Sequence, residues 1–123
     1  METEKFKLPL ESALKAITSE LSTIAKHNES SDDWEAFPVG TEVGEADSNS
    51  EADVVEEWNE RRAIVAQLET RYRNIVKALT KIEEGKYGIC EISGEPIEEE
   101  RLMVNPAART NLANMDREKE LPV

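Results

Sequence analysis

Between residues 51 and 84 the chain carries an apolar stripe that is long enough to decide its architecture. With one step interrupted by Arg61 or Arg62, its members keep the heptad spacing of a helix that packs on another helix: Trp58, Val65, Leu68, Tyr72, Ile75, Leu79 and Ile82. Ser50 can serve as N-cap and Gly85 as C-terminal cap. The pattern therefore predicts one helix over residues 51–84, a rod of roughly 50 Å at the usual helical rise.

A second and shorter stripe precedes it. Leu10, Leu14, Ile17, Leu21 and Ile24 recur at alternating steps of four and three, which predicts a helix over about residues 9–28 that starts after Pro9. With 38% hydrophobic and 34% charged residues, the core must be thin. The expected fold is mainly α, an antiparallel helical hairpin of the coiled-coil type over residues 1–85.

The net charge of −12 is concentrated in one segment. Residues 28–60 contain twelve Asp and Glu and no Lys or Arg, whereas acids and bases balance in the rest of the chain. Direct nucleic-acid binding is disfavoured, because phosphate contacts need clustered Lys and Arg. The segment is either a solvated acidic loop or a surface for a basic partner. Residues 28–50 have loop composition, and Trp34 and Phe37 are expected to pack on the second helix near Val54 and Trp58.

Beyond Gly85 the helical periodicity stops and the spacing of a zinc knuckle begins. Two pairs three residues apart, Cys90 with Ser93 and Asn111 with Asn114, stand where a structural zinc site needs two Cys-x-x-Cys pairs. We call Cys90, Ser93, Asn111 and Asn114 the four knuckle positions. Ser and Asn are poor zinc ligands, so no cofactor is expected, with zinc the ion to test for if the knuckle retains any metal binding. Side-chain hydrogen bonds and apolar packing are expected to replace the ion.

The residues around these positions resemble the bacterial DksA/TraR family of zinc-finger transcription factors. The matching residues are Ala78 to Cys90, Gly94-Glu95-Pro96-Ile97, Arg101-Leu102 and Asn105-Pro106-Ala107-Ala108. The resemblance implies a small module over residues 86–123, a degenerate zinc finger with short strands and a short helix that begins after Pro106. It also implies a cytoplasmic protein, which agrees with a single Cys and with the absence of a signal peptide or a membrane-spanning apolar run. We expect a monomer.

Members of this family insert an acidic hairpin tip into the secondary channel of RNA polymerase, so the resemblance implies that enzyme as partner. The tip, within about residues 28–53, has Asp53 at the second acid of the family pattern, whereas Ser50 and Val55 replace its first acid and its alanine. Asp47 and Glu51 are the candidate supporting carboxylates, and capping of the helix is the competing role for Asp53. No catalytic constellation is present, so an enzyme is not expected. The alternative is a zinc-free hairpin adaptor that binds another basic protein.

Overall fold

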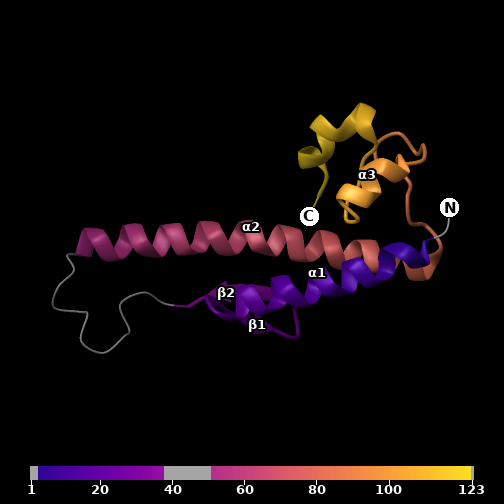
Figure 1. Cartoon of the computed structure of the whole chain (residues 1–123). Helices are drawn as coiled ribbons and strands as arrows, with labels where there is room; N and C mark the ends of the chain where they lie inside the picture. Colours follow the sequence, from indigo (N-terminus) through magenta and orange to yellow (C-terminus); the bar gives the residue numbers. More distant parts are fainter. Residues whose placement is uncertain (1–2, 38–50, 123) are drawn as a thin grey trace. The chain divides into compact units, whose positions relative to one another are not determined.

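The computed structural model describes residues 3–37 and 51–122 (Figure 1). Its elements in chain order are α1 (Glu4–Ser22), β1 (Ala25–Asn28), β2 (Asp33–Ala36), α2 (Glu51–Glu84), α3 (Glu99–Val104) and the 3-10 helix η1 (Leu112–Glu120). These elements form two compact units, Met1–Ile17 with Thr70–Val123 and Thr18–Glu69. The helices dominate, as predicted. None of them, over the described ranges, is long and apolar enough to span a membrane.

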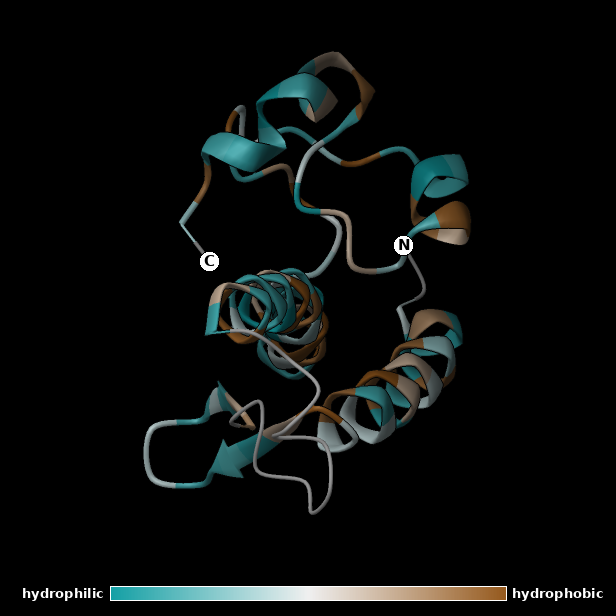
Figure 2. Cartoon of the chain, turned by 90° about the vertical axis from the view of Figure 1, so that its left-hand side faces the viewer, coloured by the Kyte–Doolittle hydropathy of each residue, from teal (hydrophilic) through white to brown (hydrophobic). Residues whose placement is uncertain are grey.

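α2 has the predicted bounds, and its C-terminal end shows why. Gly85 has a φ of 73°, the left-handed conformation that glycine adopts without a steric penalty. The amide of Lys86 donates to the carbonyl of Lys81 at 2.8 Å, and the amide of Gly85 donates to that of Ile82 at 3.3 Å. This pair of bonds is a Schellman motif, which satisfies the last carbonyls of the helix. Figure 2 looks along α2 and shows its hydrophobic residues gathered on one side.

α1 is shifted relative to its prediction, which was wrong at both ends. It begins at Glu4 and contains Pro9, because Phe6 is buried against Tyr87 with ring centroids 5.5 Å apart and this contact favours an earlier start. It ends at Ser22 and not at residue 28. There the Ser22 hydroxyl donates to the carbonyl of Thr18, and the Thr23 hydroxyl donates to that of Glu20, so hydroxyls compete for the last carbonyls.

The unit containing Thr18–Glu69 holds a β-hairpin where helix and loop were predicted. β1 and β2 pair antiparallel, with Ala25 opposite Ala36 and His27 opposite Trp34. The turn between the strands is stabilised by Asp32, which has a φ of 61° and whose Oδ1 lies 2.7 Å from Nε2 of His27. Trp34 stacks on His27 and is buried, so an aromatic pair supports the hairpin. The rest of the predicted connection, residues 38–50, lies outside the described residues.

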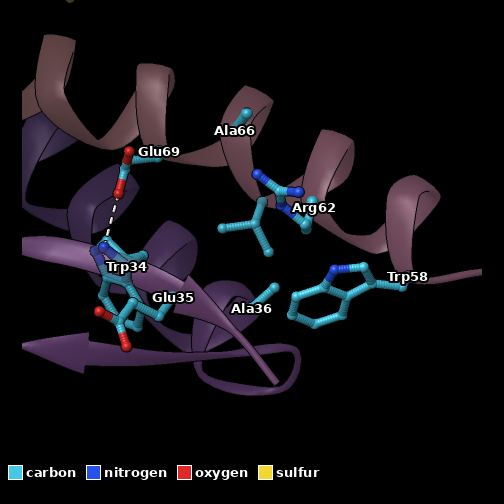
Figure 3. Close-up of a pocket in the computed structure, with 8 residues that line it drawn as sticks. Trp34, Glu35, Ala36, Trp58, Arg62, Ala66 and Glu69 are labelled. Carbon is cyan, nitrogen blue, oxygen red and sulfur yellow. Dashed lines mark hydrogen bonds between the residues drawn. The ribbon is translucent and has the colours of Figure 1, made fainter. Parts of the chain in front are cut away.

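The aromatic residues of the predicted connection differ in their burial. Trp34 meets α2 at Glu69, where its amide donates to Oε2 at 2.7 Å, whereas Trp58 lies at the other end of the cavity that both tryptophans line (Figure 3). Phe37 keeps an exposed side chain, 40% accessible, and meets α2 through its carbonyl, which accepts from Arg61 at 3.3 Å. The predicted packing of the aromatic side chains near Val54 and Trp58 is therefore wrong for Phe37. For Trp34 the bond to α2 comes from the backbone, at Glu69, and the ring stacks on His27.

The core of the other unit is made by buried side chains from α1, α2 and the C-terminal module: Phe6, Leu10, Ile17, Tyr72, Ile75, Ala78, Tyr87, Ile97 and Leu102. Tyr87 is central to it, because its hydroxyl donates to the carbonyl of Pro106 at 2.6 Å and links the start of the module to the segment that follows α3. Burial raises the pKa of Tyr87 to about 12, so the hydroxyl remains a donor at any physiological pH.

The C-terminal module has less regular structure than predicted. Among its described residues one isolated bridge, Ile89 with Pro96, stands in place of short strands, and α3 was not predicted. The helix expected directly after Pro106 begins only at Leu112, as a 3-10 helix. The reason is that the amides of Arg109 and Thr110 donate to Oε1 of Glu118, which withdraws them from helical hydrogen bonding.

Candidate functional site

The structure brings the four knuckle positions together. Cys90 and Ser93 lie on a tight turn in which the amide of Gly94 donates to the carbonyl of Cys90 at 2.9 Å. Asn111 and Asn114 lie at the start of η1. Nδ2 of Asn111 is 3.4 Å from Oγ of Ser93, and Nδ2 of Asn114 is 3.9 Å from Sγ of Cys90. Side-chain contacts therefore join the two segments where a metal would join them in a four-cysteine finger.

Asn111 has a second task in this arrangement. It is the N-cap of η1, and its Oδ1 accepts from the amide of Asn114 at 3.2 Å and from the side-chain Nδ2 of Asn114 at 2.9 Å. A carboxamide has both donor and acceptor groups, so one side chain can cap a helix and cross-link to the opposite turn. A thiolate at this position has no N–H to donate to Ser93.

The environment of the Cys90 thiol is buried and rich in donors. Only 1% of the residue is accessible. Burial raises its pKa, but hydrogen bonds from the Ser93 side chain and from the backbone of Ser93, Asn111 and Ile92 outweigh burial and lower the pKa to about 7. The knuckle thus stabilises a partial negative charge at sulfur through hydrogen-bond donors, as the amides around a metal-bound thiolate also do.

The four side chains do not suit zinc. One thiol, one hydroxyl and two carboxamides supply a single soft donor, whereas structural zinc is held by four Cys or His ligands. Within residues 3–37 and 51–122, no group of three or more His, Cys, Asp and Glu side chains lies close enough to hold a metal ion. The contacts that the structure shows at this site are hydrogen bonds between the two turns.

An ion-pair network beside the knuckle was missed by sequence reasoning. Glu91 accepts from Nε of Arg109 at 2.6 Å and from Nη2 at 2.9 Å, a bidentate pair, while Nζ of Lys81 lies 2.7 Å from its Oε2. Nη1 of Arg109 also reaches Oδ1 of Asn74 at 3.4 Å. The network connects the knuckle turn to α2. Hydrogen bonding from Arg109 is the main reason why the pKa of Glu91 falls to about 2.

Glu118 forms a second polar centre. Its Oε1 accepts from the amides of Arg109 and Thr110, from the Thr110 hydroxyl and from Nη2 of Arg101. Arg101 also donates from Nε to the carbonyl of Thr110 at 2.6 Å. Thr110 is completely buried, so these bonds satisfy its backbone groups, which would otherwise be buried without a hydrogen-bond partner. The sequence contains no spacing pattern that predicts the Glu118 centre, because its members come from three separate segments.

The predicted tip carboxylates are described only in part. Glu51 and Asp53 are exposed in the first turn of α2, where a carboxylate also stabilises the helix dipole. Asp47 and Ser50 lie outside the described residues. Both described acids belong to the unit Thr18–Glu69, which is separate from the unit that holds the knuckle.

Comparison with known proteins identifies the C-terminal module. Residues 85–110 match the sequence profile of the prokaryotic dksA/traR C4-type zinc finger. The chain is 37% identical over 79 residues to the uncharacterized protein YteA of Bacillus subtilis (strain 168), which covers 61% of this chain and 33% of YteA. It is 35% identical over 51 residues to the uncharacterized protein YlyA of the same strain, which covers 42% of this chain and 41% of YlyA. The chain thus spans well under half of each relative.

A solved structure shares the fold along almost the whole chain. Transcription factor DksA2 from Pseudomonas aeruginosa superposes with a TM-score of 0.65 over 96% of this chain and 83% of its own, at 19% sequence identity. The profile match and this fold confirm the resemblance predicted from the residues between Ala78 and Ala108. The matched profile describes a zinc finger and not an enzyme class.

Proposed function

We propose that this chain, which belongs to the DksA/TraR family of proteins with a C4-type zinc finger, is a transcription regulator that binds RNA polymerase. The observation that carries the proposal is the profile match over residues 85–110, in a chain whose fold is that of a transcription factor, DksA2. Members of this family act on polymerase with the hairpin tip. The finger belongs to the other compact unit and is not itself the contact we expect.

The contact we propose is made by the acidic tip within the secondary channel of the polymerase. Asp53 is the main candidate, with Glu51 and Asp47 in support. Glu51 and Asp53 are exposed in the first turn of α2, and residues 28–60 carry twelve acids without a base. In a channel lined by basic side chains and bound metal, such carboxylates are attracted strongly, because a narrow protein channel screens charge less than bulk water.

We also propose that the finger folds and functions without zinc. The knuckle contributes hydrogen bonds worth about 1 kcal/mol each, whereas a structural zinc contributes roughly 10 kcal/mol or more. The difference must come from elsewhere in the module. The buried side chains of Tyr87, Ile97 and Leu102 and the bidentate pair of Glu91 with Arg109 are the candidates.

A binding and transcription assay with paired variants tests the contact. Asp53→Asn and the double variant Asp47→Asn/Glu51→Gln are compared with wild type for affinity to core RNA polymerase and for transcription from a panel of promoters. Glu83→Gln is the matched control, because it removes one exposed carboxylate at the far end of the same helix. We expect the tip variants to bind about three- to tenfold more weakly, and the control to behave like wild type.

Two failures are informative in different ways. Wild-type protein that neither binds polymerase at low salt nor alters transcription would refute the proposed function, and an adaptor for another basic protein would replace it. Wild-type protein that binds while both tip variants match the control would leave the polymerase as partner and refute the assignment of the tip. The same transcription assay shows whether initiation rises or falls.

A further inference from the structure

The unit containing Thr18–Glu69 holds a cavity of about 490 Å³ that the tip proposal does not use. It is lined by Trp34, Glu35, Ala36, Trp58, Arg62, Val65, Ala66 and Glu69, shown in Figure 3. The α2 residues follow each other at steps of four, three, one and three, so they form one face of the helix. β2 supplies the opposite wall. The volume of the cavity lies within the range of small-molecule sites.

The β2 wall is held in place before any partner arrives. The amide of Trp34 donates to Oε2 of Glu69 at 2.7 Å, the dashed line in Figure 3, and its ring stacks on His27 at 4.5 Å. Trp34 is 7% accessible. A wall fixed by a strand, a ring stack and a hydrogen bond to α2 loses little conformational entropy when a side chain enters, which favours binding.

The two ends of the cavity differ in chemistry. Glu35 and Glu69 lie beside Trp34 at one end, and Ala36 and Trp58 lie at the other, as Figure 3 shows. An occupant that satisfies both ends needs an apolar stem and a cationic head, as Arg and Lys have. At the Trp58 end the chain supplies its own cation, because Cζ of Arg62 lies 5.9 Å from the ring centroid, so an incoming cationic head is favoured only at the end with Glu35 and Glu69. An uncharged apolar occupant would bring no opposite charge to these two carboxylates.

The net charge of this unit also favours a partner with cationic side chains. Residues 18–69 contain fourteen Asp and Glu against three Lys and Arg. A field of this sign attracts basic protein segments and repels nucleic-acid phosphates. The cavity therefore joins an apolar wall to carboxylates, in surroundings that concentrate cationic groups.

We propose that this cavity is an anchor site for an arginine side chain of the partner protein, and that Trp58 and Glu35 are its recognition residues. The inference rests on the proposed function, because the partner that would supply the arginine is RNA polymerase. The stem of the arginine packs on Trp58 and Val65, and its guanidinium pairs with Glu35 and with the second oxygen of Glu69. The anchor begins five residues beyond Asp53 on the same helix, so tip and anchor can bind one partner together.

Paired variants of the whole chain test the anchor in the polymerase binding assay. Trp58→Ala should weaken binding about tenfold or more, as loss of an aromatic anchor does, and Trp58→Phe should restore most of it. Glu35→Gln should weaken binding about threefold to tenfold. Glu60→Gln removes the same charge from an exposed α2 position that does not line the cavity, and it should change binding less than twofold. Equal effects of Glu35→Gln and Glu60→Gln would overturn the proposal.

A second readout does not need polymerase, because the two tryptophans of the chain both line this cavity. Protein labelled with 5-fluorotryptophan is titrated with N-acetyl-arginine amide and followed by ¹⁹F NMR. The Trp58 resonance should shift with the arginine amide and not with the uncharged citrulline amide, and Trp58→Phe should identify that resonance. Equal shifts with norleucine amide would show an apolar pocket and overturn the cationic assignment.

The outcomes separate the anchor from the proposed function. Shifts with arginine amide in a protein that does not bind polymerase would refute the polymerase as partner and leave the anchor intact. Polymerase binding that is insensitive to Trp58→Ala, with no arginine shift, would refute the anchor and leave the polymerase as partner. Sedimentation that shows a dimer dissociated by Trp58→Ala would mean that a second copy of the chain fills the cavity, which also overturns the proposal.

Discussion

Replacing Glu91 by Gln should destabilise the C-terminal module, because it removes the negative charge that pairs with Arg109 and Lys81. Glu91 makes two charge-assisted bonds to Arg109, at 2.6 and 2.9 Å, and one to Lys81 at 2.7 Å. Removing one partner of a buried pair costs about 3–5 kcal/mol, because the other charge remains buried. The Arg109 side chain is 5% accessible, but that of Glu91 is 28% accessible, so water screens part of the interaction. We expect a loss of about 2–3 kcal/mol.

The pH dependence of the unfolding free energy is a second way to measure the contribution of Glu91. The folded-state pKa of Glu91 is about 2, below its ordinary value of 4.5. A lowered carboxyl pKa contributes stability above pH 4.5, and that stability is lost as the pH falls toward 2. The full shift corresponds to roughly 3 kcal/mol before allowance for solvent screening, and it arises from the same contacts with Arg109 and Lys81. The difference between wild type and Glu91→Gln should therefore shrink steadily through this acid range.

Urea unfolding monitored by circular dichroism at a series of pH values measures both effects. Glu95→Gln is the control, since it removes an exposed carboxylate from the same turn, and it should change the unfolding free energy by less than about 0.5 kcal/mol. At neutral pH the Glu91 variant should also melt roughly 10 °C lower than wild type. Equal stabilities at neutral pH, or a difference that persists undiminished near pH 2, would refute the reasoning.

Three further predictions concern the knuckle and the cap of α2. The triple variant Ser93→Cys/Asn111→Cys/Asn114→Cys should bind one zinc per chain by metal analysis and unfold when chelated, whereas chelators should leave wild type folded. Ser93→Ala should raise the pKa of Cys90 from about 7 toward 9.0, measured by ultraviolet titration of the thiolate; an unchanged value would remove Ser93 as the main donor. Gly85→Ala should cost about 1 kcal/mol in urea unfolding, through backbone strain alone, because nothing lies within 4 Å of the added Cβ.

The sequence predicted those parts of the fold that local patterns specify. The heptad stripe and Gly85 gave both ends of α2, because a helix boundary depends on residues within one turn of it. The bounds of α1 were wrong, because Phe6 lies before Pro9 and its burial against Tyr87 is a long-range contact. The hairpin of β1 and β2 was missed for a similar reason, since its support comes from Glu69 on α2.

The candidate sites differ in the same way: local spacing could be read from the sequence, whereas long-range contacts could not. The four knuckle positions could be found because their spacing is that of a four-cysteine zinc site, and the structure brings their side chains together. The pair of Glu91 and Arg109 could not be found, because eighteen residues separate them and only the folded turn brings them together. The cavity beside Trp58 was equally hidden, because its second wall is a strand that was predicted as a loop.

The substitution of the knuckle positions changes what oxidants can do to this finger. In a four-cysteine finger, peroxide converts ligand thiolates into disulfides, and the metal and the closure are lost together. Here three of the four side chains contain no sulfur, and the single thiol cannot form a disulfide with a second cysteine of its own chain. That thiol is 1% accessible, so an oxidant reaches it only when the turn opens. We therefore expect this finger to lack the disulfide-forming step by which a four-cysteine finger loses its closure.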